Sequence, residues 1–316
     1  MRFRVFATLA VTIATLLWGC GVSRAQSTEY THQEDVIYAR KAGTALTMDV
    51  FRPKSGANGA GVIFVVSGGW FSSHGGVMPS FKRFLEPLVK RGYTAFALVP
   101  SSQPTFTIPE IVQDVSRGVR YIRFHADKYG IDKERLGIFG GSAGGHLSLM
   151  QALAAPKPHP NFAYQHPAND PVDNEPATVK AVAAFYPPTD FFNYGKEGEN
   201  ALGRGILANF RSAFEYRKVD PEKKVLVPLT EEEEKAVGLL ISPIHHVSRD
   251  DPPTLLIHGD ADKLVPIQQS EILVKKLQEV GVPVKLIVKP GAAHGWPDMS
   301  AEVAAIGDWF DQYLKK

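Results

Sequence analysis

Hydrophobic positions along this chain fall into two alternating patterns. Short apolar runs followed by turn residues are typical of buried strands. They occupy residues 62–66, 93–99, 136–140, 181–185, 254–257 and 284–289. Apolar residues with helical spacing follow Ser142 and fill segments 79–90, 108–129, 267–280 and 300–314. This alternation of strands and helices predicts an α/β protein with a mostly parallel, doubly wound sheet and helices on both of its faces.

The first two predicted strands, at residues 34–40 and 44–51, differ from the others. Apolar and polar side chains alternate in 44–51, and a short turn at residues 41–43 separates the two runs. Alternation is typical of strands with one exposed face, so we expect an edge hairpin here. In the long helix at 108–129, Asp114 is expected to pair with Arg117 or with another nearby charge.

Two insertions depart from a minimal sheet. Residues 155–178 are rich in proline, asparagine and aspartate and predict a loop. Residues 191–247 carry six aromatic residues and then an acidic run at 231–234, which Thr230 precedes as a candidate helix N-cap. We expect 191–247 to form a small, cap-like insertion beside the cleft, in a single domain over residues 26–316.

Residues 136–147 carry the strongest chemical signal. An apolar run ends at Gly140, Ser142 follows two residues later, and a helical pattern begins after it. This is the order of a Gly-x-Ser-x-Gly nucleophile elbow, whose strand-to-helix turn exposes the serine hydroxyl. Gly140 and Gly144 must be small because the strand and the helix approach closely there. The N–H of Ala143 would then face a developing oxyanion.

A histidine and several carboxylates follow in the order that this elbow requires. Serine is a weak nucleophile at neutral pH, so a neutral imidazole must accept its proton, and a carboxylate must orient that imidazole. His294 is the candidate base. Asp262 is the candidate acid, although Asp260 shares its turn and Asp190 follows an earlier strand. Both alternatives also fit turn residues. The candidates follow the C-terminal ends of predicted strands, where open α/β sheets place active sites.

The chain resembles the α/β-hydrolase esterases, and within them the acetyl-esterase and lipase-like group that includes acetyl xylan and feruloyl esterases. The resemblance covers roughly residues 35–316 and is carried by residues 140–146, 258–262 and 293–295, with 114–123 and 129–132. It implies an α/β-hydrolase fold with an eight-stranded sheet. It also implies that the second aspartate of the His-Gly-x-x-Asp turn, Asp262, is the triad acid. The triad Ser142, Asp262 and His294 needs no cofactor.

The strand at 62–66 is followed by a candidate oxyanion loop. The family usually carries His-Gly-Gly-Gly after this strand, whereas this chain reads Val66-Ser67-Gly68-Gly69-Trp70. A backbone N–H is the group required, so Gly69 or Trp70 is expected to donate it together with Ala143. Which of the two donates stays open, as does the reading of this segment as a plain turn.

The same loop supplies candidate substrate contacts. Gly68, Trp70 and Phe71 are expected to line the acyl or alcohol pocket. Alternatively, the two aromatic side chains only cover the edge of the sheet.

Five histidines outside the candidate triad are expected to have other roles. His146 and His258 flank the catalytic motifs and are expected to pack in the core or to support the catalytic side chains, and not to act as bases. His74 lies near the oxyanion loop and is a candidate substrate contact. His245 and His246 are adjacent, so on a strand they would point apart, and no metal site is predicted.

Residues 1–25 have the parts of an export signal. Arg2 and Arg4 precede an apolar run at 5–18, and residues 23–25 resemble a small-x-small cleavage site. A run of fourteen residues is too short to span a bilayer easily. We therefore expect a periplasmic or secreted protein with no stable membrane span in the mature chain. A lipoprotein attached through Cys20, or an uncleaved anchor, is the alternative.

The amino-acid composition excludes some kinds of chemistry and partner. Cys20 is the only cysteine, so cleavage at Ala25 excludes disulfides, a cysteine nucleophile and a cysteine-ligated zinc site. Removing residues 1–25 would change the formal net charge from +2 to −1. A near-neutral chain without a basic stripe does not indicate a nucleic-acid partner.

The leading hypothesis is an exported serine carboxylic-ester hydrolase that acts through an acyl-enzyme on short acyl esters. Acetyl or feruloyl groups on polysaccharide are the expected substrates, from the resemblance and the export signal. One alternative is a serine peptidase like the prolyl oligopeptidases, which share the elbow and the triad order. Another is a hydrolase fold that only binds.

Overall fold

The computed structural model describes residues 29–154 and 170–315. Its strands are β1 Tyr30–Lys41, β2 Thr44–Pro53, β3 Gly61–Val65, β4 Thr94–Val99, β5 Leu136–Gly141, β6 Ala181–Phe185, β7 Arg217–Val219, β8 Leu226–Pro228, β9 Thr254–Gly259 and β10 Val284–Lys289. Its α-helices are α1 Val77–Ser80, α2 Glu86–Lys90, α3 Ile108–Phe124, α4 Ala126–Tyr129, α5 Ala143–Ala154, α6 Glu231–Leu240, α7 Gln268–Glu279 and α8 Ser300–Leu314. Short 3₁₀ segments are η1 His74–Gly76, η3 Pro171–Asn174, η4 Gly205–Phe214 and η5 Pro243–His246, and η2 Phe81–Leu85 is a π turn.

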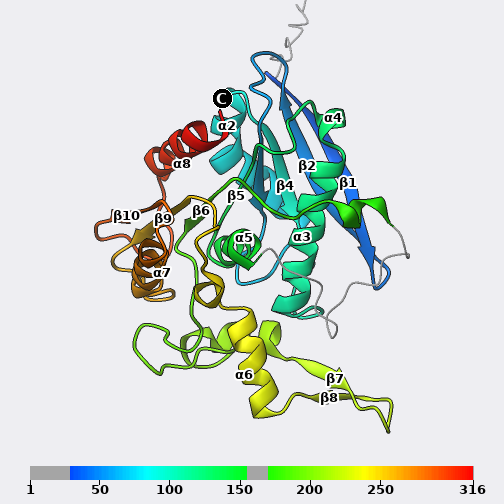
Figure 1. Cartoon of the computed structure of the whole chain (residues 1–316), viewed down its shortest axis with the longest axis vertical. Coiled ribbons are helices and arrows are strands. Elements are labelled where there is room, and N and C mark those ends of the chain that lie inside the picture. Colours follow the sequence, from blue (N-terminus) through cyan, green and yellow to red (C-terminus); the bar gives the residue numbers. More distant parts are fainter. Residues whose placement is uncertain (1–28, 155–169, 316) are drawn as a thin grey trace, which may run out of the picture.

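Eight strands form one sheet in the order β1-β2-β4-β3-β5-β6-β9-β10 (Figure 1). The six strands from β4 to β10 in this order run parallel to one another, and the β1–β2 hairpin joins them antiparallel at one edge. The predicted mostly parallel eight-stranded sheet is confirmed. Because its parallel strands share one direction, their C-terminal ends meet along a single edge.

Helices cover both faces of the sheet, as predicted. In β3, Ile63 and Val65 point into the core beneath α3, α5 and α7, whereas Val62 and Phe64 point into the core beneath η2, α2 and α8. All four side chains are buried, because successive residues of a strand face opposite sides. This two-sided burial explains why β3 is apolar throughout.

Two predicted helices are not regular α-helices over their whole length. The segment expected at 79–90 is one continuous helical stretch that contains the π turn η2 between α1 and α2. The helix expected at 108–129 breaks at His125 between α3 and α4. Helical spacing in the sequence does not distinguish an unbroken helix from such interrupted ones.

The α3 helix is held to the edge hairpin by a buried ion pair. Lys41 Nζ lies 2.7 Å from Asp114 Oδ1, and the Asp114 carboxylate is fully buried. Arg117 instead pairs with Asp170 and Asp173. Of the two expected kinds of partner for Asp114, Arg117 is excluded, and pairing with another nearby charge is confirmed, with Lys41 as that charge.

The insertion at 191–247 folds into η4, the β7–β8 hairpin, α6 and η5. Figure 1 shows it beyond one end of the sheet, with α6 and the hairpin outermost. Thr230 caps α6 through a reciprocal capping box with Glu233, as its position before the acidic run predicted. The hairpin itself carries no signal strong enough to be predicted from the sequence.

Other predictions fall partly or wholly outside the described residues. The insertion at 155–178 is described only from residue 170, where η3 lies, and the expected export signal and Cys20 are not described. In the two described ranges, no helix is long and apolar enough to cross a membrane.

Candidate active site

The turn between β5 and α5 holds Ser142 in a left-handed conformation, with φ of 54°. A Cβ atom on Gly140 would lie 2.5 Å from the backbone of Gly144, and one on Gly144 would lie 2.6 Å from the carbonyl oxygen of Val65. Neither contact is sterically possible, so both positions require glycine. The Ser142 N–H donates to the Phe185 carbonyl at 2.9 Å, which fixes the turn against β6.

The structure brings Ser142, His294 and Asp262 together from three separate strand ends. His294 Nε2 lies 2.9 Å from Ser142 Oγ, and His294 Nδ1 lies 2.7 Å from Asp262 Oδ2. These distances are in the range of hydrogen bonds from hydroxyl to imidazole and from imidazole to carboxylate. The arrangement allows His294 to accept a proton from Ser142 while Asp262 holds the imidazole in one tautomer.

Asp262 is held in its charged form. Burial alone would raise the pKa of this carboxyl group, but hydrogen bonds from His258, His294 and the Val265 N–H hold the pKa well below its usual range. Its Oδ1 atom accepts the N–H groups of Leu264 and Val265 at 2.9 and 3.0 Å. The carboxylate therefore remains a fixed negative partner for His294 at neutral pH.

The neighbouring aspartates serve other contacts. Asp260 Oδ1 accepts the Gly291 N–H at 2.6 Å, which joins the two loops that carry Asp262 and His294. Asp190 accepts the Phe192 N–H at 2.9 Å, as a turn residue does. Neither of them makes a contact with His294.

The candidate oxyanion loop is a two-residue hairpin turn. Gly68 and Phe71 exchange two backbone hydrogen bonds of 2.9 Å, and Gly69 and Trp70 between them have φ of 56° and 61°. Two successive left-handed residues are typical of a type I′ turn. Gln103 donates to the carbonyls of both turn residues, from its side chain to Gly69 and from its N–H to Trp70 at 3.1 Å.

Within the described residues, no backbone acceptor bonds the N–H of Gly69 or Trp70. Ala143 is the first residue of α5, so its N–H has no preceding helical turn to bond. In contrast, the Gly144 N–H is already bonded to the Ser67 carbonyl at 3.1 Å. The N–H groups of Ala143, Gly69 and Trp70, which are the expected oxyanion donors, therefore take no part in the backbone hydrogen bonds of these turns.

The Trp70 side chain is not where a substrate contact would be. It is 2% exposed, its ring packs edge-on against Phe214 and Phe210, and its Nε1–H donates to His146 Nδ1 at 3.2 Å. The expectation that Trp70 lines the substrate pocket is wrong, because packing against these aromatic rings and the hydrogen bond to His146 hold the indole in the core. Phe71, the next residue, is half exposed and does line the pocket.

His146 and His258 are buried, and the His258 ring lies 3.4 Å from the Asp262 carboxylate that it supports. His146 accepts from Trp70 and, through Nε2, lies 2.7 Å from the Ile241 carbonyl, which places the proton of a neutral imidazole on Nε2. Burial lowers its pKa to about 4. His258 contacts Ser270 Oγ and the Val265 carbonyl at 2.7 and 2.8 Å.

An open pocket of about 550 Å³ surrounds Ser142 and His294. Its walls include Gly68, Gly69 and Phe71 from the oxyanion loop, with Arg83, Phe84, Tyr186, Phe210 and Leu264. Tyr186 and Phe210 were not predicted as site residues. The Tyr186 ring lies 4.5 Å from the His294 ring, and Tyr186 follows β6 directly, at the sheet edge that carries the triad.

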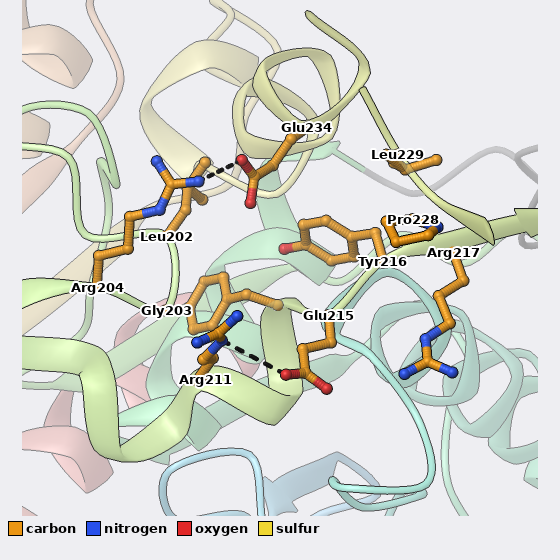
Figure 2. A pocket seen from close by; sticks show the side chains of 11 residues that line it. Leu202, Gly203, Arg204, Arg211, Glu215, Tyr216, Arg217, Pro228, Leu229 and Glu234 are labelled. Atoms are coloured by element: carbon orange, nitrogen blue, oxygen red, sulfur yellow. Dashed lines mark hydrogen bonds and ion pairs between the residues drawn. The ribbon is translucent and has the colours of Figure 1, made fainter. Parts of the chain in front are cut away.

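A second pocket, of about 450 Å³, lies within the insertion (Figure 2). Its charged side chains are mostly paired, with Arg204 2.6 Å from Glu234 and Arg211 3.4 Å from Glu215. It contains no triad residue. The pocket that surrounds Ser142 is therefore the candidate active site.

The remaining predicted histidines lie outside the pocket. His74 Nε2 is 3.0 Å from Asp49 Oδ1, so its ring faces the edge hairpin and not the substrate pocket. His246 contacts the Leu240 carbonyl at 2.7 Å. No cluster of metal-ligating groups includes His245 or His246 in the described part of the chain.

Comparison with known sequences matches the BD-FAE family over residues 48–277, which is most of the chain. The chain belongs to this family. Among curated proteins, it is 29% identical over 280 residues to esterase LipC of Mycobacterium tuberculosis, covering 88% of this chain and 62% of LipC. It spans about three fifths of the length of the curated relatives that it matches.

Solved structures show the same architecture. A truncated carbohydrate esterase from gut microbiota has a TM-score of 0.74 and 25% sequence identity, with 92% of this chain and 99% of the other covered. Thermogutta terrifontis esterase 2 has a TM-score of 0.65 at 20% identity, with 92% and 96% covered. Together with the eight-stranded sheet, these similarities confirm the predicted α/β-hydrolase fold.

Proposed function

We propose that this BD-FAE family member is a serine carboxylic-ester hydrolase that forms an acyl-enzyme. One observation carries the proposal, namely the continuous contact from Ser142 Oγ through His294 to Asp262, at 2.9 and 2.7 Å. The similarity to esterase LipC and to a carbohydrate esterase supports it.

In the first half of the proposed reaction, His294 Nε2 accepts the Ser142 proton as Oγ attacks the ester carbonyl carbon. The charge that develops on the carbonyl oxygen is stabilised by the N–H of Ala143 with that of Gly69 or Trp70. His294 then gives the proton to the departing alcohol oxygen, and the acyl group remains on Ser142. Asp262 stabilises the imidazolium throughout without becoming protonated.

In the second half, water replaces the alcohol. His294 accepts a proton from the water as it attacks the acyl carbon, and then returns this proton to Ser142 Oγ as the carboxylic acid leaves. No cofactor takes part in this sequence.

Short acyl esters on polysaccharide, acetyl or feruloyl groups among them, are the proposed substrates. The pocket is open, which suits a bulky alcohol such as a polymer chain, and Phe71, Phe84 and Phe210 offer apolar and aromatic contacts. Similarity to a carbohydrate esterase supports this class. Export directed by residues 1–25, also part of the proposal, would bring the enzyme to such polymers.

The test is hydrolysis of para-nitrophenyl esters from acetate to decanoate by the wild type and by Ser142→Ala. We expect turnover of the shorter esters, and a fall in kcat of at least about 10³-fold in the variant. Ser55→Ala, in an exposed loop, is the matched control and should keep full activity. A Ser142→Ala enzyme with more than about one per cent of wild-type kcat would show that Ser142 is not the nucleophile.

Two further measurements separate the alternatives. Cleavage of a dipeptidyl anilide without ester hydrolysis would favour a peptidase. Failure of an organophosphonate probe to label the folded protein at Ser142 would favour a fold that only binds.

A further inference from the structure

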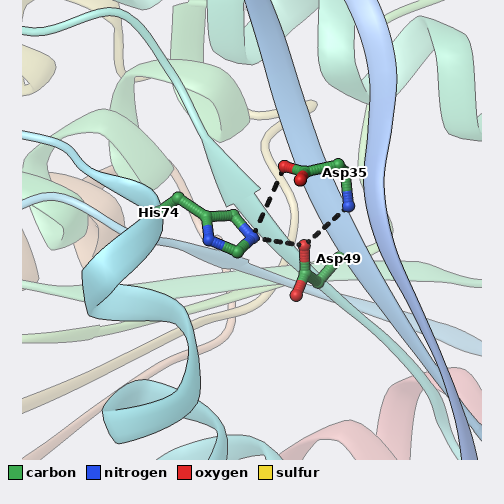
Figure 3. A group of neighbouring side chains, drawn as sticks. All are labelled: Asp35, Asp49 and His74. Carbon is green, nitrogen blue, oxygen red and sulfur yellow. Dashed lines mark hydrogen bonds and ion pairs between the residues drawn. The ribbon is translucent and has the colours of Figure 1, made fainter.

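A second group of chemically active side chains lies outside the triad. Asp35 from β1, Asp49 from β2 and His74 from η1 converge at the edge of the sheet (Figure 3). In the described ranges, these three residues bring a carboxylate oxygen, a second carboxylate oxygen and an imidazole nitrogen within 4.8 Å of one another. The expected substrate contact of His74 does not account for this arrangement.

The spacing of these atoms suits a small cation. His74 Nε2 lies 3.0 Å from Asp49 Oδ1 and 3.5 Å from Asp35 Oδ1. In a tetrahedral zinc site, bonds of about 2.0–2.1 Å place neighbouring ligand atoms roughly 3.3 Å apart. The two measured separations lie on either side of that value.

A second histidine fixes the orientation of the Asp49 carboxylate. Its side chain is 1% exposed, and its second oxygen, Oδ2, lies 2.7 Å from His32 Nε2. Pairing of this kind behind a ligand is common at protein metal sites, where it fixes the direction of the ligand. Asp35 lies at an irregularity of β1, between residues whose register with β2 shifts, and its carboxylate is 66% exposed.

The charge balance also favours a cation. The charged groups that act on His74 are Asp49, Asp35 and Glu34, and all three are acidic. Within the described chain, no lysine or arginine forms an ion pair with Asp35 or Asp49. Two carboxylates therefore converge on the His74 imidazole, and a second imidazole, that of His32, contacts Asp49.

We propose that Asp35, Asp49 and His74 bind one divalent transition-metal cation, with Zn²⁺ as the best fit. One imidazole nitrogen and two carboxylate oxygens form a donor set that zinc accepts, and the exposure of Asp35 and His74 leaves a coordination position open to water. Because His74 follows the oxyanion hairpin, and Ser73 and Gly76 line the active-site pocket, the ion would join this loop to the edge strands.

The test is calorimetric titration of the chelator-treated full chain with zinc chloride. We expect saturable binding of one Zn²⁺ per chain, with a Kd in the micromolar range or below. Asp35→Asn and His74→Gln should each weaken the affinity at least about tenfold. Asn tolerates a left-handed backbone, so Asp35→Asn removes the charge without adding strain at a residue with φ of 52°.

The control is His245→Gln, which removes an exposed histidine from another surface and should leave the Zn²⁺ affinity unchanged. Circular dichroism of each metal-free variant checks that it is folded. Two results would overturn the proposal. One is the absence of saturable binding by the wild type at Zn²⁺ concentrations up to about 1 mM, which is the Kd of weak protein sites for metal ions. The other is equal affinity in the wild type and both site variants. Binding is read directly, so the outcome does not depend on whether the protein hydrolyses esters.

Discussion

Two residues of the candidate active site have a strained backbone that contacts elsewhere in the fold stabilise. Ser142 and Trp70 both have left-handed backbones, with φ of 54° and 61°, although neither is glycine. Such conformations cost roughly 1–3 kcal/mol each and persist only where the surroundings stabilise them. For Ser142 the stabilising contact is the hydrogen bond to Phe185, and for Trp70 it is the burial of the indole beside His146.

The buried imidazole of His146 predicts a pH dependence of stability. Its pKa in the folded protein is about 4, below the ordinary value near 6.5. As the pH falls below 6.5, the unfolded chain takes up a proton at this residue while the folded protein does not, so stability is lost on acidification. Between pH 7.5 and 5.0 this contribution falls by about 2 kcal/mol.

Urea unfolding at both pH values, on the wild type and on His146→Gln, measures this effect. Glutamine cannot titrate but keeps a donor and an acceptor for Ile241 and Trp70. We expect the loss of stability between pH 7.5 and 5.0 to be about 2 kcal/mol smaller in the variant. Equal losses in the two proteins would show that His146 is not buried in its neutral form.

At the scale of elements, the site depends on two tight connections at the same edge of the sheet. The β5–α5 turn presents Ser142, and the hairpin turn of Gly69 and Trp70 presents the candidate N–H donors. The insertion closes over the second of these, because the Phe210 ring of η4 lies directly against Gly69. Each element is therefore positioned by a partner that is distant in the sequence.

Gly69→Ala tests this fit. A Cβ atom there would lie 2.3 Å from the Phe210 ring, on a residue whose φ of 56° already disfavours a side chain. We expect a loss of about 1–3 kcal/mol in the free energy of unfolding and a fall in kcat of roughly 10²-fold, because the candidate donors shift. Urea unfolding and ester hydrolysis measure the two effects.

Gly68→Ala is the matched control for stability, since a Cβ atom at Gly68 meets nothing within 4 Å. Its free energy of unfolding should stay within about 0.5 kcal/mol of the wild type. If both variants are equally stable, the contact between Phe210 and the oxyanion turn does not restrict residue 69.

On the scale of the whole molecule, the residues of the pocket come both from the main sheet and from the insertion at 191–247. The C-terminal ends of β5, β9 and β10 lead to the triad, β3 leads to the oxyanion loop, and η4 contributes Phe210 as a wall. Substrate shape is therefore expected to depend on the insertion, and bond cleavage on the sheet.

Phe210→Ala should change the preference for acyl chain length. Removing the ring enlarges the pocket, so we expect the ratio of kcat/KM for hexanoate to that for acetate to rise about tenfold. Kinetics on the para-nitrophenyl series measure the ratio. Phe192→Ala is the control, because Phe192 belongs to the same insertion and does not line the active-site pocket. A similar change in the control would indicate a general loosening of the insertion.

Much of this architecture is predictable from local patterns. The strands β3, β5, β6 and β9 are apolar because both of their faces are covered. The positions of Ser142, Asp262 and His294 follow from where β5, β9 and β10 end. The interruptions at η2 and His125 and the short β7–β8 hairpin are not predictable in this way, since they depend on a few backbone hydrogen bonds that leave no hydrophobic period.

Two features of the structure are not predictable from the local sequence. The sequence places Trp70 next to Phe71 in the loop, but the Trp70 ring is buried in the core whereas Phe71 is half exposed and lines the pocket. Likewise, Asp35, Asp49 and His74 are far apart in the sequence, and no motif joins them. Only the pairing of β1 with β2, and the return of the chain at η1, brings these side chains together.

The sequence by itself determined the fold class, the eight strands of the main sheet and two residues of the candidate triad, Ser142 and His294, because hydrophobic periodicity and turn residues are local properties of the chain. The choice of Asp262 over Asp260 and Asp190 came from the resemblance to the esterases. The tertiary structure alone decided which side chains face the pocket, how His146 supports the oxyanion turn and where the carboxylates of the edge hairpin meet His74. Those features depend on distances between segments that are remote in the chain, and such distances are set by packing.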